Sequence, residues 1–266
     1  MSAGSHPVSL LRRLSEILNR QLGRIGYTLV RTSEEKTAPY VVAHEGIRYA
    51  YEPVQRLDAL APWRTDAAFL DIWQKVQSHT LVDIFRCYEI YQTVRSLAGT
   101  PGDIVEVGVW RGGTGAILAA AAKQWKPAAR VWLCDTFSGV VKAGRFDRIY
   151  SGGEHADASP EIVIQLLSTL ELDNTKILSG VFPEETGSAI DAASVALIHV
   201  DVDTYGSAAG AMAWAADRMS AGAVAIFDDY GFSSCSGVTR LVDELRRTGD
   251  WLWFYNINGH AILVRR

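Results

Sequence analysis

The chain has 266 residues, of which 48% are hydrophobic and 21% are charged, and its formal net charge is −4. This composition excludes the disordered and low-complexity classes and leaves enough chain for the core of one large or two small domains. Because general affinity for nucleic acids depends on basic patches that neutralise phosphates, the slightly acidic balance argues against a nucleic-acid partner.

The three cysteines, Cys87, Cys134 and Cys235, lie far apart and form no Cys-x-x-Cys pair. This spacing fits neither a disulfide framework nor a zinc ribbon, and it favours a reducing compartment. The sequence contains no run of about 20 apolar residues, which is the length that a membrane-spanning helix requires. Arginines also interrupt the first apolar residues before the core of a signal peptide could form. We therefore expect a cytoplasmic protein without a membrane span.

Residues 1–64 form an N-terminal extension, whose clearest pattern is a basic amphipathic helix over residues 8–30. Its leucines and isoleucines recur at helical spacing with arginines between them, and Gly26 can end it. Two interpretations remain open, which are binding to a membrane surface and packing on its own domain or on a second subunit. We favour packing, and we expect a homo-oligomer of two or more copies.

An apolar stripe at helical spacing over residues 66–98 predicts two helices. We expect the break at residues 78–80, where Thr80 can cap a second helix that begins at Leu81. The turn residues 100–103 then end this helical region.

From residue 103 the pattern alternates between strands and helices. The predicted strands cover residues 103–109, 130–135, 175–179, 194–201 and 222–228, and the predicted helices cover residues 113–125, 159–171, 183–192, 206–219 and 236–248. Strands that are apolar almost throughout indicate a doubly wound, mostly parallel α/β sheet that is covered on both faces. The last two strands, 251–257 and 260–265, flank Asn258-Gly259, a strong hairpin signal. The sheet should therefore carry one antiparallel strand at its C-terminal end.

In such a sheet, ligands bind at the carboxyl ends of the strands. The first strand ends in a glycine-rich turn that reads Glu106-Val-Gly108-Val-Trp110-Arg111-Gly112-Gly113-Thr114-Gly115. Its spacing differs from the G-x-G-x-x-G of dinucleotide folds. Glu106 suits a ligand with an ammonium group or hydroxyls and repels a pyrophosphate. The alternative is a strand–helix turn that binds no ligand.

The second strand ends in Asp135, at a position that typically bonds the hydroxyls of a ribose. The alternative role for this residue is a helix cap or a turn. Together with the glycine-rich turn, Asp135 indicates a ligand that carries a nucleoside.

Two neighbouring strands end in acidic pairs, Asp201-Val-Asp203 and Asp228-Asp229. Carboxylates at one rim repel one another unless a cation joins them, and a site of oxygen ligands suits Mg²⁺. Since alternate residues of an extended chain face the same way, Asp201 and Asp203 should share a side. The alternative is that these acids cap the helices that follow them.

The loop over residues 138–158 is long enough to be a lid or a binding loop. We interpret His155 in this loop as a solvent-facing residue rather than a base. Tyr205 either lines a pocket for the acceptor or is a core aromatic residue.

As an ordered set, these motifs resemble the macrocin O-methyltransferase family, whose members methylate sugar hydroxyls in bacterial natural products. The resemblance covers roughly residues 65–266, the second predicted domain. It rests on Thr80-Leu-Val-Asp83 with Arg86, on the turn Glu106–Gly113, on Asp135–Gly139, on Gly180–Pro183, on Ile198–Tyr205 and on Asp228–Gly231.

The resemblance implies the class I methyltransferase fold, S-adenosylmethionine and Mg²⁺ as cofactors, and a sugar hydroxyl of an antibiotic-type glycoside as the acceptor. Asp201, Asp228 and Asp229 would hold the metal, and Asp203 would be the general base. The residues implied for the cofactor are Thr80, Glu106, Gly108, Trp110, Arg111, Gly112, Gly113, Thr114, Asp135, Gly180, Phe182 and Asp201.

Two other kinds of function remain alternatives. A nicotinamide-dependent sugar oxidoreductase would also use Asp135, but it predicts the absent G-x-G-x-x-G and leaves the four aspartates without a role. A non-catalytic protein could dock on a membrane or a partner through the basic helix, but it too gives the acidic pairs no role.

Overall fold

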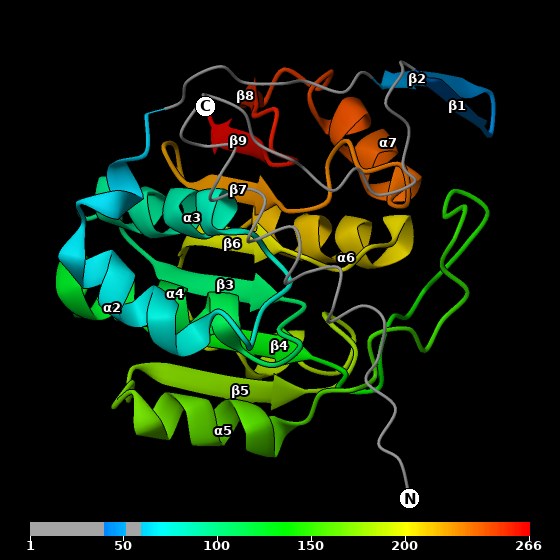
Figure 1. The fold of residues 1–266 in the computed structure, drawn as a ribbon. Coiled ribbons are helices and arrows are strands. Elements are labelled where there is room, and N and C mark those ends of the chain that lie inside the picture. Colours follow the sequence, from blue (N-terminus) through cyan, green and yellow to red (C-terminus); the bar gives the residue numbers. More distant parts are fainter. Residues whose placement is uncertain (1–39, 52–59) are drawn as a thin grey trace, which may run out of the picture. The chain divides into compact units, whose positions relative to one another are not determined.

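The structure is a computed structural model that describes residues 40–51 and 60–266 (Figure 1). The amphipathic helix expected over residues 8–30 lies outside the described residues. A small sheet of two strands, β1 (Tyr40–His44) and β2 (Ile47–Tyr51), is described from the N-terminal extension. The larger of the two compact units of the chain contains residues 58–266 and all of the elements that form the site.

A seven-stranded sheet organises the larger unit, with the strand order β5-β4-β3-β6-β7-β9-β8 (Figure 1). Its strands are β3 (Asp103–Val107), β4 (Val131–Asp135), β5 (Thr175–Ser179), β6 (Val195–Val200), β7 (Val224–Phe227), β8 (Trp251–Tyr255) and β9 (Ala261–Arg265). Strands β3 to β7 pair in parallel, and β9 is antiparallel to both β7 and β8. The predicted antiparallel strand at the C-terminal end is confirmed.

Helices cover both faces of this sheet. They are α2 (Ala67–Val76), α3 (Ile84–Ser96), α4 (Gly113–Trp125), α5 (Pro160–Thr169), α6 (Tyr205–Ala216) and α7 (Ser236–Leu245). Alternate residues of a strand face opposite sides, so Ile104 packs in the core with α2 to α5, whereas Val105 packs with α6 and α7. The prediction of a sheet covered on both faces is therefore confirmed.

The start of α3 differs from the prediction. Thr80 does not cap the helix, because its Oγ1 accepts a hydrogen bond from the Val82 N–H at 3.0 Å. The N-cap is Asp83, whose Oδ1 accepts from the backbone N–H groups of Phe85 and Arg86 at 2.9 and 3.0 Å. The predicted cap at Thr80 is therefore wrong, and α3 begins at Ile84 instead of Leu81. Thr and Asp are both favourable caps, so residue type alone does not distinguish them.

The helix predicted over residues 183–192 is wrong, because this segment contains only the short 3₁₀ turn η3 (Gly187–Ala189). The bond from the Ala189 N–H to the Thr186 carbonyl spans three residues, as in a 3₁₀ turn. Gly187 also lowers helix propensity, and it packs against the rings of Pro183 and Trp214.

The hairpin of β8 and β9 exists, but its loop is longer than the two residues expected. The strand β8 ends at Tyr255, and the Asn256 N–H donates to the His260 carbonyl at 3.0 Å. The Asn256 side chain accepts from the Asn258 N–H at 2.6 Å, which closes the turn inside this loop. As a result, His260 directly precedes β9.

Candidate active site

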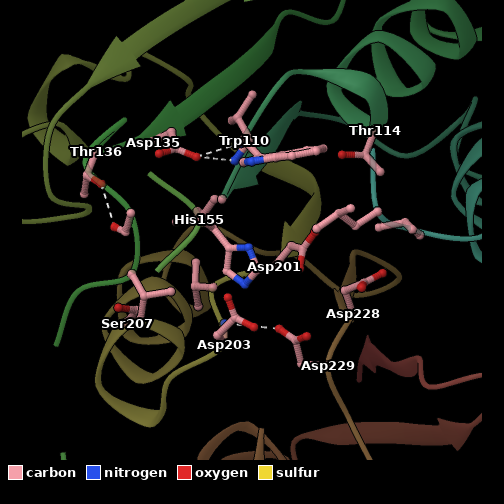
Figure 2. A pocket seen from close by; sticks show the side chains of 18 of the residues that line it. Trp110, Thr114, Asp135, Thr136, His155, Asp201, Asp203, Ser207, Asp228 and Asp229 are labelled. Atoms are coloured by element: carbon pink, nitrogen blue, oxygen red, sulfur yellow. Dashed lines mark hydrogen bonds between the residues drawn. The ribbon is translucent and has the colours of Figure 1, made fainter. Parts of the chain in front are cut away.

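A cavity of about 290 Å³ opens at the carboxyl ends of β3, β4, β6 and β7. Figure 2 shows Asp135 and Trp110 at one end of it and Asp203 and Asp229 at the other, with Asp201 between them in this view. Of the residues that the sequence predicted, the cavity is lined by Thr80, Gly108, Trp110, Thr114, Asp135, Gly180, Phe182, Asp201, Asp203, Asp228 and Asp229. The fold thus brings the glycine-rich turn and both acidic pairs into one site.

Four predicted residues do not line the cavity, namely Glu106, Arg111, Gly112 and Gly113. Gly112 is the N-cap of α4 with a φ of +87°, and the Gly113 N–H donates to the His79 carbonyl at 2.9 Å. Gly113 therefore joins the start of α4 to the segment between α2 and α3. The Arg111 guanidinium stacks on the Trp110 ring, 4.5 Å from its centroid.

Glu106 is completely buried beneath the glycine-rich turn. Its Oε1 lies 3.0 Å from Nδ1 of His199, which is also completely buried. Burial lowers the pKa of His199, but the neighbouring carboxylates of Asp228 and Glu106 outweigh this effect and raise it to about 10. Glu106 therefore pairs with His199 on the neighbouring strand instead of facing the cavity.

Gly108 occupies a position that no side chain can share. Its φ is +90°, and a Cβ built there would lie 1.6 Å from the Asp201 carbonyl oxygen. The Asp201 N–H donates to the Val107 carbonyl at 2.9 Å, so the ends of β3 and β6 touch at this point. Glycine is required here by close approach as well as by conformation.

Replacing Gly108 by alanine is expected to cost at least about 3 kcal/mol of stability, the upper range for overpacking. For a domain of this size, that lowers Tm by about 6–12 °C. The matched control is Gly222→Ala, where φ is +86° but nothing lies within 4 Å of the added Cβ. Thermal unfolding of both variants checks the prediction, and equal losses of Tm would show that conformation alone, and not the contact with Asp201, sets the cost.

Asp135 ties the glycine-rich turn to the end of β4. Its Oδ2 accepts from the backbone N–H groups of Val109 and Trp110 at 2.6 and 2.8 Å, and its Oδ1 accepts from the Phe137 N–H at 2.7 Å. A carboxylate offers about four lone-pair positions, so Asp135 keeps acceptor capacity for one further donor in the cavity. Asp135 therefore has the turn role that the sequence offered as an alternative, and it can still accept a hydrogen bond from a ligand.

Three carboxylates meet at the ends of β6 and β7. Asp201, Asp228 and Asp229 each offer a ligand oxygen, and these atoms lie within 4.8 Å of one another. Burial, together with the charges of the other aspartates, raises the pKa values of Asp201 and Asp229 well above the usual range. Ionisation of Asp201 and Asp229 is therefore unfavourable unless a cation lies beside them.

Asp228 differs from the other two carboxylates because cationic groups surround it. Its Oδ2 forms an ion pair with Arg86, and its Oδ1 accepts from Nε2 of His260 at 2.8 Å. Burial raises the pKa of Asp228, but His199, His260 and Arg86 outweigh this effect and hold it well below the usual range. Sequence reasoning gave no role to His199 or His260, although His199 is the polar residue inside the otherwise apolar strand β6 and His260 directly precedes β9.

Asp203 reaches the cavity by a route that strand alternation did not predict. The strand β6 ends at Val200, and Asp203 has a φ of +64°, so the chain turns before this residue. Its N–H donates to Oδ2 of Asp229 at 3.1 Å, and its Oδ1 lies 3.6 Å from the Cys235 thiol. Burial raises the pKa of Asp203. Backbone strain of this kind is concentrated at functional sites.

The loop over residues 138–158 contributes Tyr150 and His155 to the cavity lining. It folds back on itself, since the Val140 N–H donates to the Glu154 carbonyl at 2.8 Å. Asp157 then accepts from the Trp110 indole N–H at 2.8 Å, which ties the loop to the glycine-rich turn. His155 is exposed, as expected, and it also borders the cavity (Figure 2).

Tyr205 does not line the cavity. Its hydroxyl donates to Glu244 on α7 at 2.8 Å, and its ring packs against Phe146. Of the two roles weighed for Tyr205, the structure therefore favours packing.

Among the described residues, no helix is long and apolar enough to cross a membrane.

Comparisons with known proteins agree with this geometry. Residues 56–251 match the family model described as macrocin-O-methyltransferase (TylF). A tetracenomycin-type rhamnosyl 4'-O-methyltransferase of Streptomyces olivaceus is 31% identical over 66% of this chain and 76% of its own length. The mycinamicin III 3''-O-methyltransferase of Micromonospora griseorubida is 28% identical over 64% of this chain and 75% of its own length.

The solved structure of the O-methyltransferase NovP is also similar, with a TM-score of 0.61 and 26% identity over 70% of this chain and 82% of that one. The calicheamicin methyltransferase CalS11 shares the fold, with a TM-score of 0.57 and 15% identity over 79% of this chain and 99% of that one. The strand order, the glycine-rich turn and the family match lead to one conclusion: the chain belongs to the macrocin O-methyltransferase family and has the class I methyltransferase fold.

Proposed function

We propose that this protein transfers the methyl group of S-adenosylmethionine to a sugar hydroxyl of a glycosylated natural product, assisted by Mg²⁺ and by Asp203 as general base. The observation that carries the proposal is the single cavity that joins the Asp135 turn to the carboxylate cluster. The relatives' names support the acceptor class, since one acts on a rhamnosyl tetracenomycin and another on mycinamicin III.

The residues around the first half of the cavity fit S-adenosylmethionine. Gly108 contributes to the wall of the cavity without a side chain, and Trp110 presents an aromatic ring to the same cavity (Figure 2). Asp135 keeps an acceptor position free for a ribose hydroxyl. Thr80, Gly180 and Phe182 complete this part of the wall, and the proposal gives them contact with the nucleoside.

The second half of the cavity fits a divalent cation. Burial raises the pKa values of Asp201 and Asp229, and so do the neighbouring aspartates, which include Asp228 in both cases. A bound cation would favour the ionised form of both acids. Asp201 accepts no hydrogen bond from another residue of the described chain, so its oxygens are available as ligands. A set of oxygen ligands suits Mg²⁺, which keeps waters and accepts substrate oxygens.

When bound, S-adenosylmethionine supplies an electrophilic methyl group, and a divalent cation lowers the pKa of a hydroxyl that it contacts. The chain itself orients the acceptor and removes its proton. Asp203 takes that proton on a carboxylate oxygen, as a general base within hydrogen-bond reach. The Asp229 carboxylate, the Cys235 thiol and the Tyr150 hydroxyl hold Asp203 in place.

Calorimetry with S-adenosylhomocysteine, with and without Mg²⁺, tests the proposal. We expect binding of S-adenosylhomocysteine and no binding of NADH, and we expect methylation in a screen of glycosylated natural products and free nucleotide sugars. Failure to bind S-adenosylhomocysteine would contradict the cofactor assignment. Activity that is complete in excess EDTA would contradict the cation.

Replacing Asp135 by asparagine is expected to weaken binding of S-adenosylhomocysteine by about 1–3 kcal/mol, or roughly 5–150-fold. The amide has one acceptor oxygen instead of two, so its NH₂ group must face the backbone N–H of Phe137 or those of Val109 and Trp110. The acceptor KM should not change. Asp173→Asn, at an exposed site on the surface, is the control, and an unaltered affinity in the Asp135 variant would refute the ribose assignment.

The cytoplasmic location and the homo-oligomer expected from the sequence stay predictions. Both depend on the composition and on the N-terminal pattern over residues 8–30, and the geometry of the site adds nothing to either.

A further inference from the structure

His260 is completely buried behind the carboxylate cluster and outside the cavity lining. Its Nε2 lies 2.8 Å from Oδ1 of Asp228, and its Nδ1 lies 2.5 Å from Oε2 of Glu89. An ionised carboxylate can accept hydrogen bonds but cannot donate them. Each ring nitrogen of His260 therefore faces a hydrogen-bond acceptor. The imidazole is thus a bridge between a cluster aspartate and a glutamate on α3.

Glu89 is held in turn by the hairpin of β8 and β9. Both of its carboxylate oxygens lie 2.6 Å from Nδ2 of Asn256, the first residue of the hairpin loop. The backbone of Asn256 also bonds to His260. Two side chains from one loop therefore converge on Glu89, which fixes the tilt of the His260 ring.

Asp228 consequently has a cationic partner on each of its two oxygens. Arg86 takes Oδ2, and it also donates to the Asp228 carbonyl at 3.2 Å and to Asp83 at 2.8 Å. A single partner would leave the carboxylate free to turn about its Cβ–Cγ bond. Partners on opposite oxygens restrict that rotation. His260 is the hydrogen-bond partner on Oδ1 at 2.8 Å, and Nε2 of His199 lies 3.8 Å from the same oxygen.

We propose that His260 is a positioning residue, which fixes the Asp228 carboxylate in the orientation that a divalent cation requires and is itself oriented by Glu89. The inference rests on the proposed function, because it needs a cation at the cluster. Groups that hydrogen-bond to ligating carboxylates typically change metal affinity or activity by about 10–100-fold when they are replaced. The loss should fall on the affinity for the cation and not on the affinity for S-adenosylhomocysteine.

Two amide substitutions separate the two bonds of His260. Asparagine places its NH₂ near the position of Nδ1, so His260→Asn keeps a donor for Glu89 and loses the donor for Asp228. Glutamine reaches to the position of Nε2, so His260→Gln keeps the donor for Asp228. We expect His260→Asn to weaken Mn²⁺ binding by about 10–100-fold, and His260→Gln to restore most of that loss.

The measurement is Mn²⁺ binding to the full chain, followed by the EPR signal of the free ion, with calorimetry of S-adenosylhomocysteine and thermal unfolding as parallel readouts. Glu89→Gln tests the hydrogen bond between Glu89 and His260 without removing side-chain volume from the core. We expect it to weaken Mn²⁺ binding less than His260→Asn does. Glu244→Gln is the matched control, because Glu244 is also a hydrogen-bonded glutamate on a helix but bonds to Tyr205 and Arg240 and not to His260.

Wild-type Mn²⁺ affinity in both His260 variants overturns the positioning role and leaves the proposed function standing. Equal losses in both variants, with lower Tm and weaker S-adenosylhomocysteine binding, also overturn it and indicate a role in folding only. If the wild-type chain binds no Mn²⁺, the proposed cation site fails, and the role of His260 fails with it.

Discussion

Replacing Asp203 by asparagine is expected to lower kcat by about 10²–10⁴-fold, the range for a lost general base, while Mg²⁺ remains bound. Asparagine keeps the shape of the side chain, and the backbone bond from residue 203 to Asp229 is unaffected. What is lost is the basic oxygen that takes the acceptor proton. The acceptor KM and the affinity for S-adenosylhomocysteine should both change little.

The dependence of the rate on pH gives the same assignment a second test. The base must be ionised, so kcat falls as pH drops through the pKa of Asp203. Burial raises this pKa above the usual range of aspartate, so the decline should begin at a higher pH than for an exposed carboxylate. This acid limb should disappear in the asparagine variant.

Two rival assignments predict different outcomes. If Asp203 is a further metal ligand, Asp203→Asn raises the Mg²⁺ concentration required and leaves kcat near normal at saturation. If His155 is the base, His155→Gln and not Asp203→Asn removes the rate, since both side chains border the cavity. Measurement of kcat against Mg²⁺ concentration for the two variants distinguishes the three assignments.

Asp201→Asn and Asp229→Asn are expected to abolish turnover while affinity for S-adenosylhomocysteine stays within about tenfold, because a metal ligand acts on the acceptor oxygen and not on the cofactor body. Each variant removes one charged oxygen ligand from a cluster of three. The measurements are turnover, Mn²⁺ binding and calorimetry with S-adenosylhomocysteine. Asp217→Asn, at the exposed end of α6, is the control.

Asp228→Asn should behave differently from the other two variants. It leaves Arg86 and His260 without their shared carboxylate, and an uncompensated buried charge costs about 3–5 kcal/mol. We therefore expect a lower Tm in addition to the loss of turnover. Normal Tm in Asp228→Asn would show that the ion pairs around this residue contribute little to folding.

The positions of the strands, and of the aspartates at their carboxyl ends, could be predicted because both depend on local sequence pattern. The helix α4 was predicted with the bounds that the structure has, Gly113–Trp125, since its glycines and alanines mark its start and its buried face. The acids Asp201 and Asp228 had to lie close together once their strands were expected to be neighbours. Because the strands were expected to be parallel neighbours, their carboxyl ends could also be predicted as the location of the site.

Other features of the site depend on contacts that a local pattern does not contain. Glu89 and His260 are 171 residues apart in the chain, and only the tertiary fold brings α3 next to the hairpin of β8 and β9. The left-handed backbone at Asp203 has no sequence signal comparable to a glycine. Glu106 was expected at the cavity because it precedes a glycine-rich turn, but a histidine on the next strand keeps it in the core.

The position of β9 in the sheet determines when, during synthesis, the sheet and the site can be completed. This strand comes after all of the others described in the chain, but it lies between β7 and β8. Until residues 261–265 have left the ribosome, β7 has an open edge, which is a site for aggregation. His260 emerges just before them, so a nascent chain can present every carboxylate of the cluster and still lack a complete site. The site can therefore be completed only after β9 has been made, and chains that stop before β9 should depend on chaperones.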